Sequence, residues 1–283
     1  MQLLGSYDEY QNMIREFRKI CKRPFSNVYY VPDDLERYIQ LGRAFYDKTE
    51  SGIVFYFDEE LYYRVCLCID EKEKLSINRL DKKILIKNVY QKGKKRENLQ
   101  CVEQQLEEMG FEKTGTSVRI KGEVQHLFEK CKRMEKYVHM LEKKGYRCVA
   151  ADFSMFEEIE AIILDSGIIK DYQLNYRTDE EKKKLVNGSY MCMLNSNDEM
   201  CIGSVCVIES NIAKGVALAV KEKYKMHGLT PAIAFHRAKW FYDNEIKYAQ
   251  GWILVDNEPS LRYYQSMGYE LTNEYADEWI FDK

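Results

Sequence analysis

The same short string closes both halves of this 283-residue chain. An amphipathic run ends at Met109-Gly-Phe-Glu-Lys-Thr114 in the first half and at Met267-Gly-Tyr-Glu-Leu-Thr272 in the second, each followed by a strand-like tail. A glycine after an amphipathic run is a common helix stop, because it accepts a left-handed backbone. The longer pattern Met-Gly-aromatic-Glu-x-Thr favours a duplication over chance capping, so we expect two copies of one fold.

Helical and strand-like segments alternate in both halves, which predicts a mixed α/β (α+β) sheet with helices on its faces. Helices are expected over residues 7–22, 33–44, 96–109, 154–164, 175–186, 231–244 and 258–267. Strands are expected at residues 28–31, in a hairpin over 52–69, and at 83–90, 146–152, 190–195, 199–209, 212–222, 248–255, 269–274 and 277–281. Apolar residues at helical spacing between the halves predict a connecting helix that Gly145 ends. The expected domains are therefore 1–123, a connecting helix over 124–145, and 146–283.

The composition indicates a folded protein of the cytoplasm. Hydrophobic residues make up 45% of the chain and charged residues 31%, and the longest apolar runs are far shorter than the roughly 20 residues of a membrane span. The first ten residues do not have the pattern of a secretory signal. Nine cysteines without a CxxC pair suggest reduced thiols, and no metal site is expected from their spacing to the histidines.

Charge is distributed unevenly along the chain. Residues 1–145 contain 28 Lys and Arg against 24 Asp and Glu, whereas residues 146–283 contain 15 against 22. An acidic surface favours a cationic or amine-bearing substrate and repels nucleic acid. A mixed solvated surface accounts for the same numbers equally well, so charge alone does not decide the function.

The segment from Val216 to Pro231 reads as a hydrophobic strand, a short loop with Gly228 and then a helix. Thr230 is suited to the N-cap of that helix and Pro231 to its first position. Backbone N–H groups at such a helix start converge on one point and can bind a pyrophosphate. An ordinary strand-to-helix turn with one glycine remains the alternative when this segment is considered alone.

A second segment follows the strand at Trp252–Val255. Asn257 is placed to cap a short helix by accepting from the Ser260 amide, and Gly268 is placed to end it. Tyr263 and Tyr264 are adjacent on that helix and therefore about 100° apart. We expect one of the two to pack into the core and the other to reach a cleft at the edge of the sheet.

With these motifs, residues 146–283 resemble the GNAT superfamily of acyl-CoA-dependent N-acyltransferases. The similarity is strongest in Asn257-x-x-Ser260-x-x-x-Tyr264-x-x-x-Gly268-Tyr269. The resemblance implies a mixed, mostly antiparallel sheet flanked by helices. It also implies an acetyl-CoA donor, an amine acceptor and no metal. With the repeated ending, it makes the chain similar to tandem GNAT proteins.

The resemblance assigns roles to particular residues. Tyr264 is implied as the general acid that protonates the departing thiolate, and Asn257 as a contact to the cofactor. Leu218, Ala219 and Val220 are implied to bond the pantetheine arm through their backbone. The residues Lys225, Met226, His227, Gly228, Leu229 and Thr230 fall where the family has its pyrophosphate loop. Lys and Thr replace the usual first and last residues of that loop, which puts cofactor affinity in doubt.

The implied reaction is direct attack of a primary amine, of a small molecule or peptide, on the thioester of acetyl-CoA. Proximity and backbone donors would supply most of the catalysis. Glu209 and Asp256 are candidates for the general base, although each is more simply a solvated or capping carboxylate. The first half retains Glu107-Glu-Met-Gly-Phe111 but has no tyrosine like Tyr264 and no comparable phosphate loop, so it resembles a degenerate copy.

Two other functions stay open at this point. The chain could be a non-catalytic module that binds or senses acyl-CoA, which the changes at Lys225 and Thr230 favour. It could also be an aminoacyl-tRNA-dependent transferase, for which the basic segment Lys92–Arg96 is the supporting feature and the acidic second half the opposing one. Partners expected otherwise are acetyl-CoA and a small amine, with no nucleic acid and no membrane. A homodimer is a possible assembly.

Overall fold

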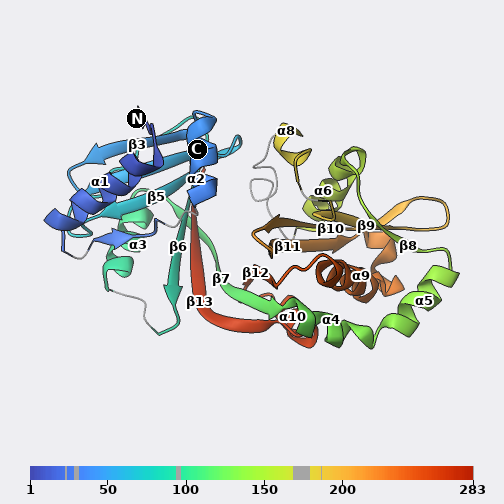
Figure 1. The fold of residues 1–283 in the computed structure, drawn as a ribbon. Coiled ribbons are helices and arrows are strands. Elements are labelled where there is room, and N and C mark those ends of the chain that lie inside the picture. Colours follow the sequence, from blue (N-terminus) through green and yellow to red (C-terminus); the bar gives the residue numbers. More distant parts are fainter. Residues whose placement is uncertain (23, 29–31, 94–96, 168–178, 186, 283) are drawn as a thin grey trace. The chain divides into compact units, whose positions relative to one another are not determined.

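The computed structural model describes residues 1–283 except 23, 29–31, 94–96, 168–178, 186 and 283. Two compact units share the chain (Figure 1). The N-terminal unit consists of residues 1–117 and 273–283, and the C-terminal unit of residues 118–272. Two strands, β7 (Glu112–Glu123) and β13 (Glu270–Phe281), each contribute residues to both units. The domain ranges predicted from the sequence refer to the two repeat copies and remain a prediction. The strand that follows the first copy, β7, lies partly in the C-terminal unit, and most of the strand that ends the second copy, β13, lies in the N-terminal unit.

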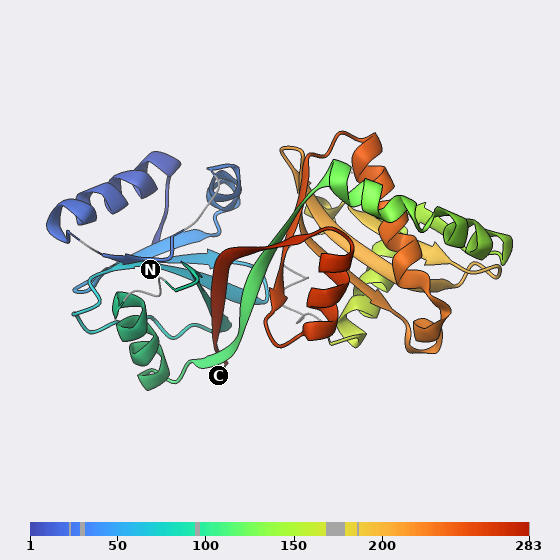
Figure 2. The same ribbon diagram turned by 90° about the horizontal axis from the view of Figure 1, so that it is seen from below.

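The N-terminal unit is a sheet with helices on both faces. Its strands are β1 (Gln2–Leu3), β2 (Phe25–Ser26), β3 (Ala44–Thr49), β4 (Gly52–Asp58), β5 (Tyr62–Ile69) and β6 (Lys83–Gln91), with residues of β13 beside β6. Pairing is antiparallel except between β5 and β6. Figure 2 shows α1 (Tyr7–Ile20) and α3 (Glu97–Glu108) on opposite sides of these strands.

Two apolar clusters hold these layers together. Phe55 and Phe57 face Leu35 of α2 (Pro32–Gln40) and the buried side of α1, whereas Val102 of α3 packs with Trp279 on the other face. Because β4 is buried on both sides, its sequence is a continuous apolar run instead of an alternating one.

The C-terminal unit repeats this arrangement. Its sheet has the order β8 (Arg147–Ala150), β9 (Tyr190–Leu194), β10 (Met200–Glu209), β11 (Ile212–Val220) and β12 (Tyr248–Leu254), followed by residues of β7. The 3-10 helix η1 (Phe153–Met155) and α6 (Phe156–Asp165) lie on one face, and α9 (Leu229–Asp243) lies on the other (Figure 1). The helices α4 (Val124–Lys132), α5 (Glu135–Lys143) and α10 (Glu258–Ser266) join the α9 face, and α8 spans Asp179–Lys182.

The structure corrects several sequence expectations. The connecting helix over 124–145 is two helices, α4 and α5, separated at Arg133–Met134. The helix expected over 33–44 ends at Gln40, and strand β3, which was not predicted, begins at Ala44. The strands expected at 269–274 and 277–281 are one strand, β13. Most of the predicted strand 28–31, and residues 175–178 and 186 of the predicted helix 175–186, lie outside the described residues.

Both repeat glycines end a helix as predicted. Gly110 has φ +88° and Gly268 has φ +99°, values that residues with a Cβ rarely adopt.

No helix among the described residues has the length and apolar character required to cross a membrane. No group of three or more His, Cys, Asp or Glu in the described ranges is arranged to hold a metal ion.

Candidate active site

The parallel strands β11 and β12 are paired over only part of their length. Ile212–Lys214 pair with Tyr248–Gln250, and a register shift against β10 places an extra residue in β11 between Lys214 and Ala217. Such a bulge bends its strand. Beyond it, β11 continues its ladder with β10 alone among the described strands. The bulge therefore opens the sheet and leaves one edge of β11 without a neighbouring strand.

Leu218, Ala219 and Val220 lie on this open edge. Leu218 and Val220 pack with the α9 side of the sheet, whereas Ala219 is buried on the α6 side. The backbone of these residues, on the side away from β10, is what an extended ligand arm could bond, in the manner of an added strand.

A pocket of about 40 Å³ lies beside the open edge, between β11, α9 and α10. It is lined by Leu127, Cys131, Ser204, Leu218, Ile233, Ala234, Arg237, Ala238, Phe241, Tyr263, Tyr264, Met267 and Tyr269. Most of these side chains are apolar, so the few polar atoms of the wall determine what the pocket can orient.

Tyr264 lines this pocket, and so does Tyr263. The ring centroid of Tyr264 lies 5.3 Å from that of Tyr263 and 5.2 Å from that of Tyr269, with nearly perpendicular planes. Tyr263 also packs against the buried cluster below α9 and α10, whereas Tyr264 is not part of that cluster. Tyr263 also donates from its hydroxyl to the Thr230 carbonyl oxygen at 3.4 Å, which links α10 to the first turn of α9.

Burial raises the pKa of Tyr264 to about 12, and the nearby Arg237 guanidinium lowers it in part. The phenol of Tyr264 therefore keeps its proton at neutral pH. A tyrosine that holds its proton beside an open strand edge can serve as a proton donor.

Asn257 occupies the cap position predicted from the sequence. Its Oδ1 accepts from the Ser260 amide at 3.2 Å, and its carbonyl oxygen accepts from the Leu261 amide at 3.1 Å. Asn257 thus fixes the start of α10, the helix that carries Tyr264.

The loop before α9 differs from the sequence expectation in its cap. A 3-10 turn, η2 (Glu222–His227), precedes Gly228, and α9 begins at Leu229 with Gly228 at the N-cap. Thr230 is therefore in the first turn and does not cap the helix, so that prediction is wrong. Gly228 has φ +71°, and a Cβ there would lie 1.8 Å from the Tyr137 hydroxyl. Only glycine fits this position, on both backbone and steric grounds.

The other loop residues face different surroundings. Lys225 is exposed and forms an ion pair with Glu222 at 2.5 Å, and Met226 is 95% exposed. Leu229 is buried in the core, so only its backbone can contact a ligand.

His227 is held by two tyrosines of neighbouring segments. The Tyr137 hydroxyl donates to its carbonyl oxygen at 3.1 Å, and the Tyr146 hydroxyl lies 2.8 Å from its Nδ1. The loop therefore has its own partners from α5 and from the start of the second copy.

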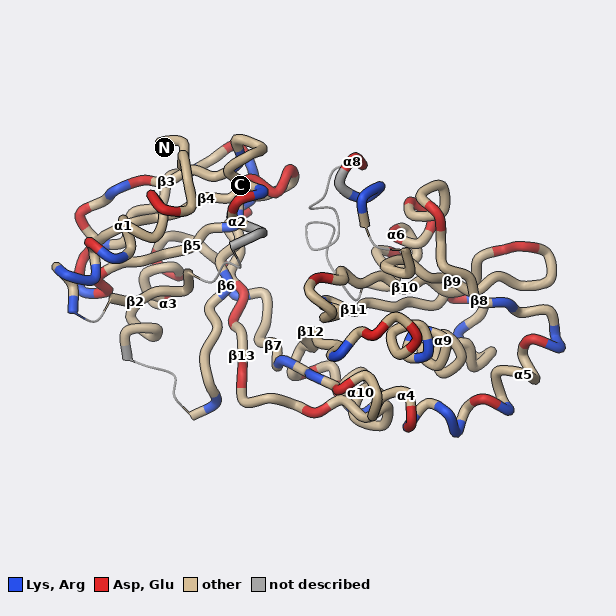
Figure 3. Tube along the Cα trace, in the orientation of Figure 1, with Lys and Arg blue, Asp and Glu red and all other residues tan. Residues whose placement is uncertain are grey.

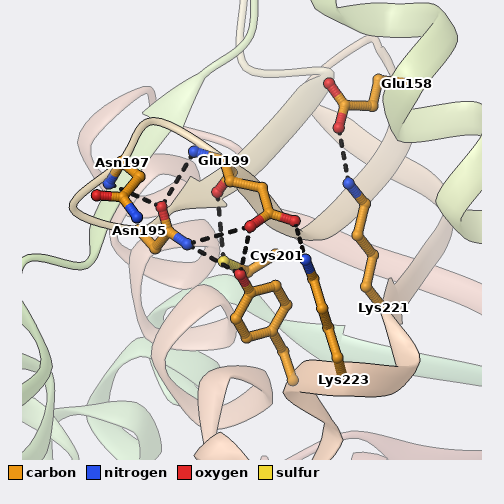
Figure 4. Close-up of polar contacts among 8 residues, drawn as sticks. Glu158, Asn195, Asn197, Glu199, Cys201, Lys221 and Lys223 are labelled. Atoms are coloured by element: carbon orange, nitrogen blue, oxygen red, sulfur yellow. Dashed lines mark hydrogen bonds and ion pairs between the residues drawn. The ribbon is translucent and has the colours of Figure 1, made fainter.

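A polar cluster ties the same loop to the β9–β10 turn (Figure 4). Glu199 accepts from the Tyr224 hydroxyl at 2.6 Å and pairs with Lys223, while the Asn195 amide donates to the Tyr224 hydroxyl at 2.9 Å. The hydrogen bonds from Lys223 and Tyr224 lower the pKa of Glu199. Lys221 pairs with Glu158 at 2.8 Å. The sequence pattern did not indicate this cluster, because its members are distant along the chain.

Arg237 is the functional candidate that sequence reasoning missed. It lies on α9 among Ala234, Ala238 and Phe241, in what reads as an apolar helix face, but its side chain is buried on the pocket wall. The two proposed bases lie elsewhere. Glu209 pairs with Lys214 at 2.6 Å, Asp256 is exposed, and neither lines the pocket.

The basic excess of residues 1–145 is largely local. Residues 124–145 contain six Lys and Arg against three Glu, and blue and red segments alternate along α4 and α5 (Figure 3). In the segment Lys92–Arg96, residues 94–96 lie outside the described part of the chain. Most of the basic excess of residues 1–145 therefore lies in residues 124–145, where acidic residues alternate with basic ones.

Neither a family model nor a curated protein sequence matches the chain. Solved structures do match its fold. A GCN5-related N-acetyltransferase from Kribbella flavida aligns with a TM-score of 0.54 and 12% identity, over 88% of this chain and 93% of that one. A tandem GNAT protein from the clavulanic acid biosynthesis pathway aligns at 0.52 and 10%, over 99% and 97%. A GCN5-related N-acetyltransferase-like protein from Streptococcus suis aligns at 0.52 and 13%, over 95% and 99%.

These alignments span both units, and each unit contains a partly separated parallel strand pair within a mixed sheet covered by helices on both faces. The protein therefore has the GNAT fold, in a tandem arrangement.

Proposed function

We propose that the C-terminal unit transfers an acyl group, in the simplest case acetyl, from coenzyme A to a primary amine of a small molecule or peptide. The observation that carries this proposal is the open edge at Leu218–Val220 with Tyr264 on the wall of the adjoining pocket. The edge suits an extended amide-containing arm, and the tyrosine suits the end of that arm where the thioester would be.

The residues present fit coenzyme A in part. Backbone donors of the first turn of α9, at Leu229 and Thr230, are suited to a pyrophosphate, and Asn257 is a candidate polar contact. Lys221 and Lys225 are each paired with a carboxylate, so a phosphate would compete with those pairs. We infer moderate cofactor affinity from this loop.

In the proposed reaction the amine nitrogen attacks the thioester carbonyl carbon, a C–N bond forms and the C–S bond breaks. The sulfur leaves as a thiolate and takes the proton of the Tyr264 hydroxyl, and the attacking amine gives up its own proton to solvent. Tyr264 is left as a phenolate, which the neighbouring positive charge of Arg237 stabilises. The phenolate then recovers a proton from water.

Calorimetric titration of the full chain with acetyl-CoA, followed by thiol release over a panel of amines, tests this proposal. Binding at tens of micromolar and amine-dependent release of free thiol are expected. Absence of acetyl-CoA binding at that concentration would rule the proposal out.

A module that binds acyl-CoA without turnover is the second candidate. The observation that favours it is the loop before α9, where Tyr137 lies against Gly228 and His227 is held at both its carbonyl and its ring. Acetyl-CoA binding without thiol release across the amine panel would support this function over catalysis.

A further inference from the structure

Arg237 is buried without a counter-ion among the described residues. Its side chain is 5% exposed. The guanidinium donates to the backbone oxygens of Gly188, Ser189 and Ser204, to the Ser204 hydroxyl at 2.9 Å and to the Cys206 sulfur at 3.2 Å. All of these acceptors are neutral.

This arrangement is costly for the folded protein. Arginine stays protonated in proteins, and a buried charge without an opposite partner is strongly destabilising. The Nε atom of Arg237 is also buried and has no hydrogen-bond partner in the described part of the chain. The Nε–H is thus the guanidinium donor that the described residues leave unused, and the charge has no opposite partner among them.

The pocket gives an anion a place and a size. Arg237 is on its wall, together with the hydroxyl-bearing side chains of Ser204, Tyr263 and Tyr264, and the rest of the lining is mostly apolar. One water needs roughly 10–15 Å³ of such space. The pocket of about 40 Å³ therefore has room for a group of a few heavy atoms.

We propose that this pocket binds a carboxylate carried by one of the substrates, with Arg237 as its counter-ion. The terminal N–H groups of Arg237 already donate to protein acceptors, so a carboxylate would accept from the remaining Nε–H and supply the missing opposite charge. A phosphate has the same charge chemistry but is larger, and the pocket of about 40 Å³ favours the smaller group. The proposal rests on the acyl-transfer function in taking the carrier to be a substrate. The carboxylate can belong to the far end of the acyl chain or to the amine acceptor.

The first arm of the test compares two donors of equal chain length. Calorimetric titration of the full wild-type chain with succinyl-CoA and butyryl-CoA measures the effect of a terminal carboxylate in place of a methyl group. If the acyl chain carries the carboxylate, succinyl-CoA binds at least about tenfold more tightly.

The second arm compares acceptors. Thiol release is measured with an amino acid and with its carboxamide at a fixed acyl-CoA concentration. If the acceptor carries the carboxylate, KM for the amino acid is at least about tenfold lower than KM for the carboxamide. A carboxylate preference below about threefold in both arms overturns the proposal, whether or not acyl transfer itself is observed.

Variants connect the preference to the residue. Arg237→Met removes the charge at similar length and is expected to abolish the preference. Arg262→Met is the matched control, since Arg262 is exposed on α10 and pairs with Glu258. Retention of the preference in Arg237→Met overturns the role of Arg237. If Arg237→Met does not fold, the proposal is judged from wild-type protein alone, by the preference for succinyl-CoA over butyryl-CoA and for the amino acid over its carboxamide.

If no acyl-CoA binds at all, the acyl-transfer function fails, and the carboxylate site is decided separately. The thermal midpoint is then measured in sodium succinate and in sodium chloride at equal ionic strength. A rise in succinate for wild type and for Arg262→Met, absent in Arg237→Met, supports a carboxylate site. Equal midpoints in the two salts overturn it.

Discussion

The N-terminal and C-terminal units each contain one parallel strand pair that separates part-way along, and the two gaps are filled differently. In the N-terminal unit, the pairing of β5 with β6 is limited to Tyr62–Val65 of β5, which lie opposite Lys83–Ile86 of β6. The edge of β5 beyond Val65 then receives β2, which pairs Phe25 with Ile69 and Ser26 with Cys68. A segment of the chain thus takes the place that a ligand arm would take in the other unit.

Asn27 completes this closure. Its Oδ1 accepts from the Leu67 amide at 2.6 Å, and its Nδ2 donates to the Asn88 Oδ1 at 3.0 Å and to the Lys87 carbonyl oxygen at 3.4 Å. One side chain therefore bridges the two separated strands. Exposed strand edges are usually paired or covered in native proteins. Here β2 and Asn27 cover the edge of β5.

The N-terminal unit also lacks the polar side chains that carry the proposed chemistry in the C-terminal unit. Counted back from the repeat glycine, Tyr264 corresponds to Leu106 and Asn257 to Leu99, and both leucines are buried in the core of the N-terminal unit. No helix lies between β5 and β6, since residues 70–82, all described, contain none. A helix start like that of α9 is therefore absent between these two strands.

A hollow of about 560 Å³ remains beside the filled gap, lined by Phe25, Ser26 and the end of β6. The same fold can therefore leave a strand edge open or close it with its own backbone. Whether the edge is open or closed depends on residues outside the repeated Met-Gly-aromatic string, here Phe25, Ser26 and Asn27.

The largest difference between the two units is expected at Tyr264. Tyr264→Phe removes the proton donor and keeps the ring, so we expect thiol release to slow by about 100-fold, or about 2.7 kcal/mol in the barrier. Acetyl-CoA affinity should change little. Tyr263→Phe is the matched control and should keep most of the rate, because it loses one 3.4 Å hydrogen bond to Thr230. A Tyr264→Phe enzyme as fast as wild type would exclude the general-acid role.

Asn27→Ala tests whether the N-terminal gap is closed for structural reasons. The Leu67 amide would lose its partner, and we expect the free energy of unfolding to fall by about 1–3 kcal/mol in denaturant titrations. Thiol release by the folded protein should be unchanged. Titrated acetyl-CoA should bind with a stoichiometry of one per chain in wild type and variant alike. Two sites per chain would mean that the N-terminal hollow also binds the cofactor.

Tyr137→Phe examines how far the C-terminal loop is closed by its own contacts. The variant loses the hydrogen bond to the His227 carbonyl oxygen and frees space next to Gly228. A hydrogen bond of this kind contributes roughly 0.5–1.5 kcal/mol, so acetyl-CoA affinity should rise a few-fold. A weaker affinity would show instead that the Tyr137 hydroxyl helps to hold the loop in its binding form.

The smallest effect is expected from alkaline pH. Burial raises the pKa of Tyr264 to about 12, so its proton is retained well above the pH at which an exposed tyrosine ionises, roughly 10. The thiol-release rate at saturating substrates should therefore not decline between pH 8 and 10. A loss of activity with a midpoint near pH 10 would indicate that Tyr264 is solvated during turnover.

Local patterns in the sequence determined much of this protein. The repeated glycine stop, the Asn257 cap and the glycine loop before α9 depend on neighbours within a few residues. With the alternation of elements, they gave the sequence its resemblance to the GNAT superfamily, and the fold that this resemblance implied is confirmed. The start of α9 shows the limit of such patterns, since Gly228 caps it although Thr230 has the better capping side chain.

Tertiary structure alone decided the rest. The filling of the N-terminal gap depends on Asn27 meeting Leu67 and Asn88, 40 and 61 residues away. The exchange of β7 and β13 between the units and the burial of Arg237 beside Tyr264 likewise join distant segments. Periodicity reports which face of an element is apolar, but it does not report which distant partner covers that face. The sequence around Arg237 therefore gives no signal of its acceptors, which are Gly188 and Ser189 just before β9 and Ser204 and Cys206 on β10.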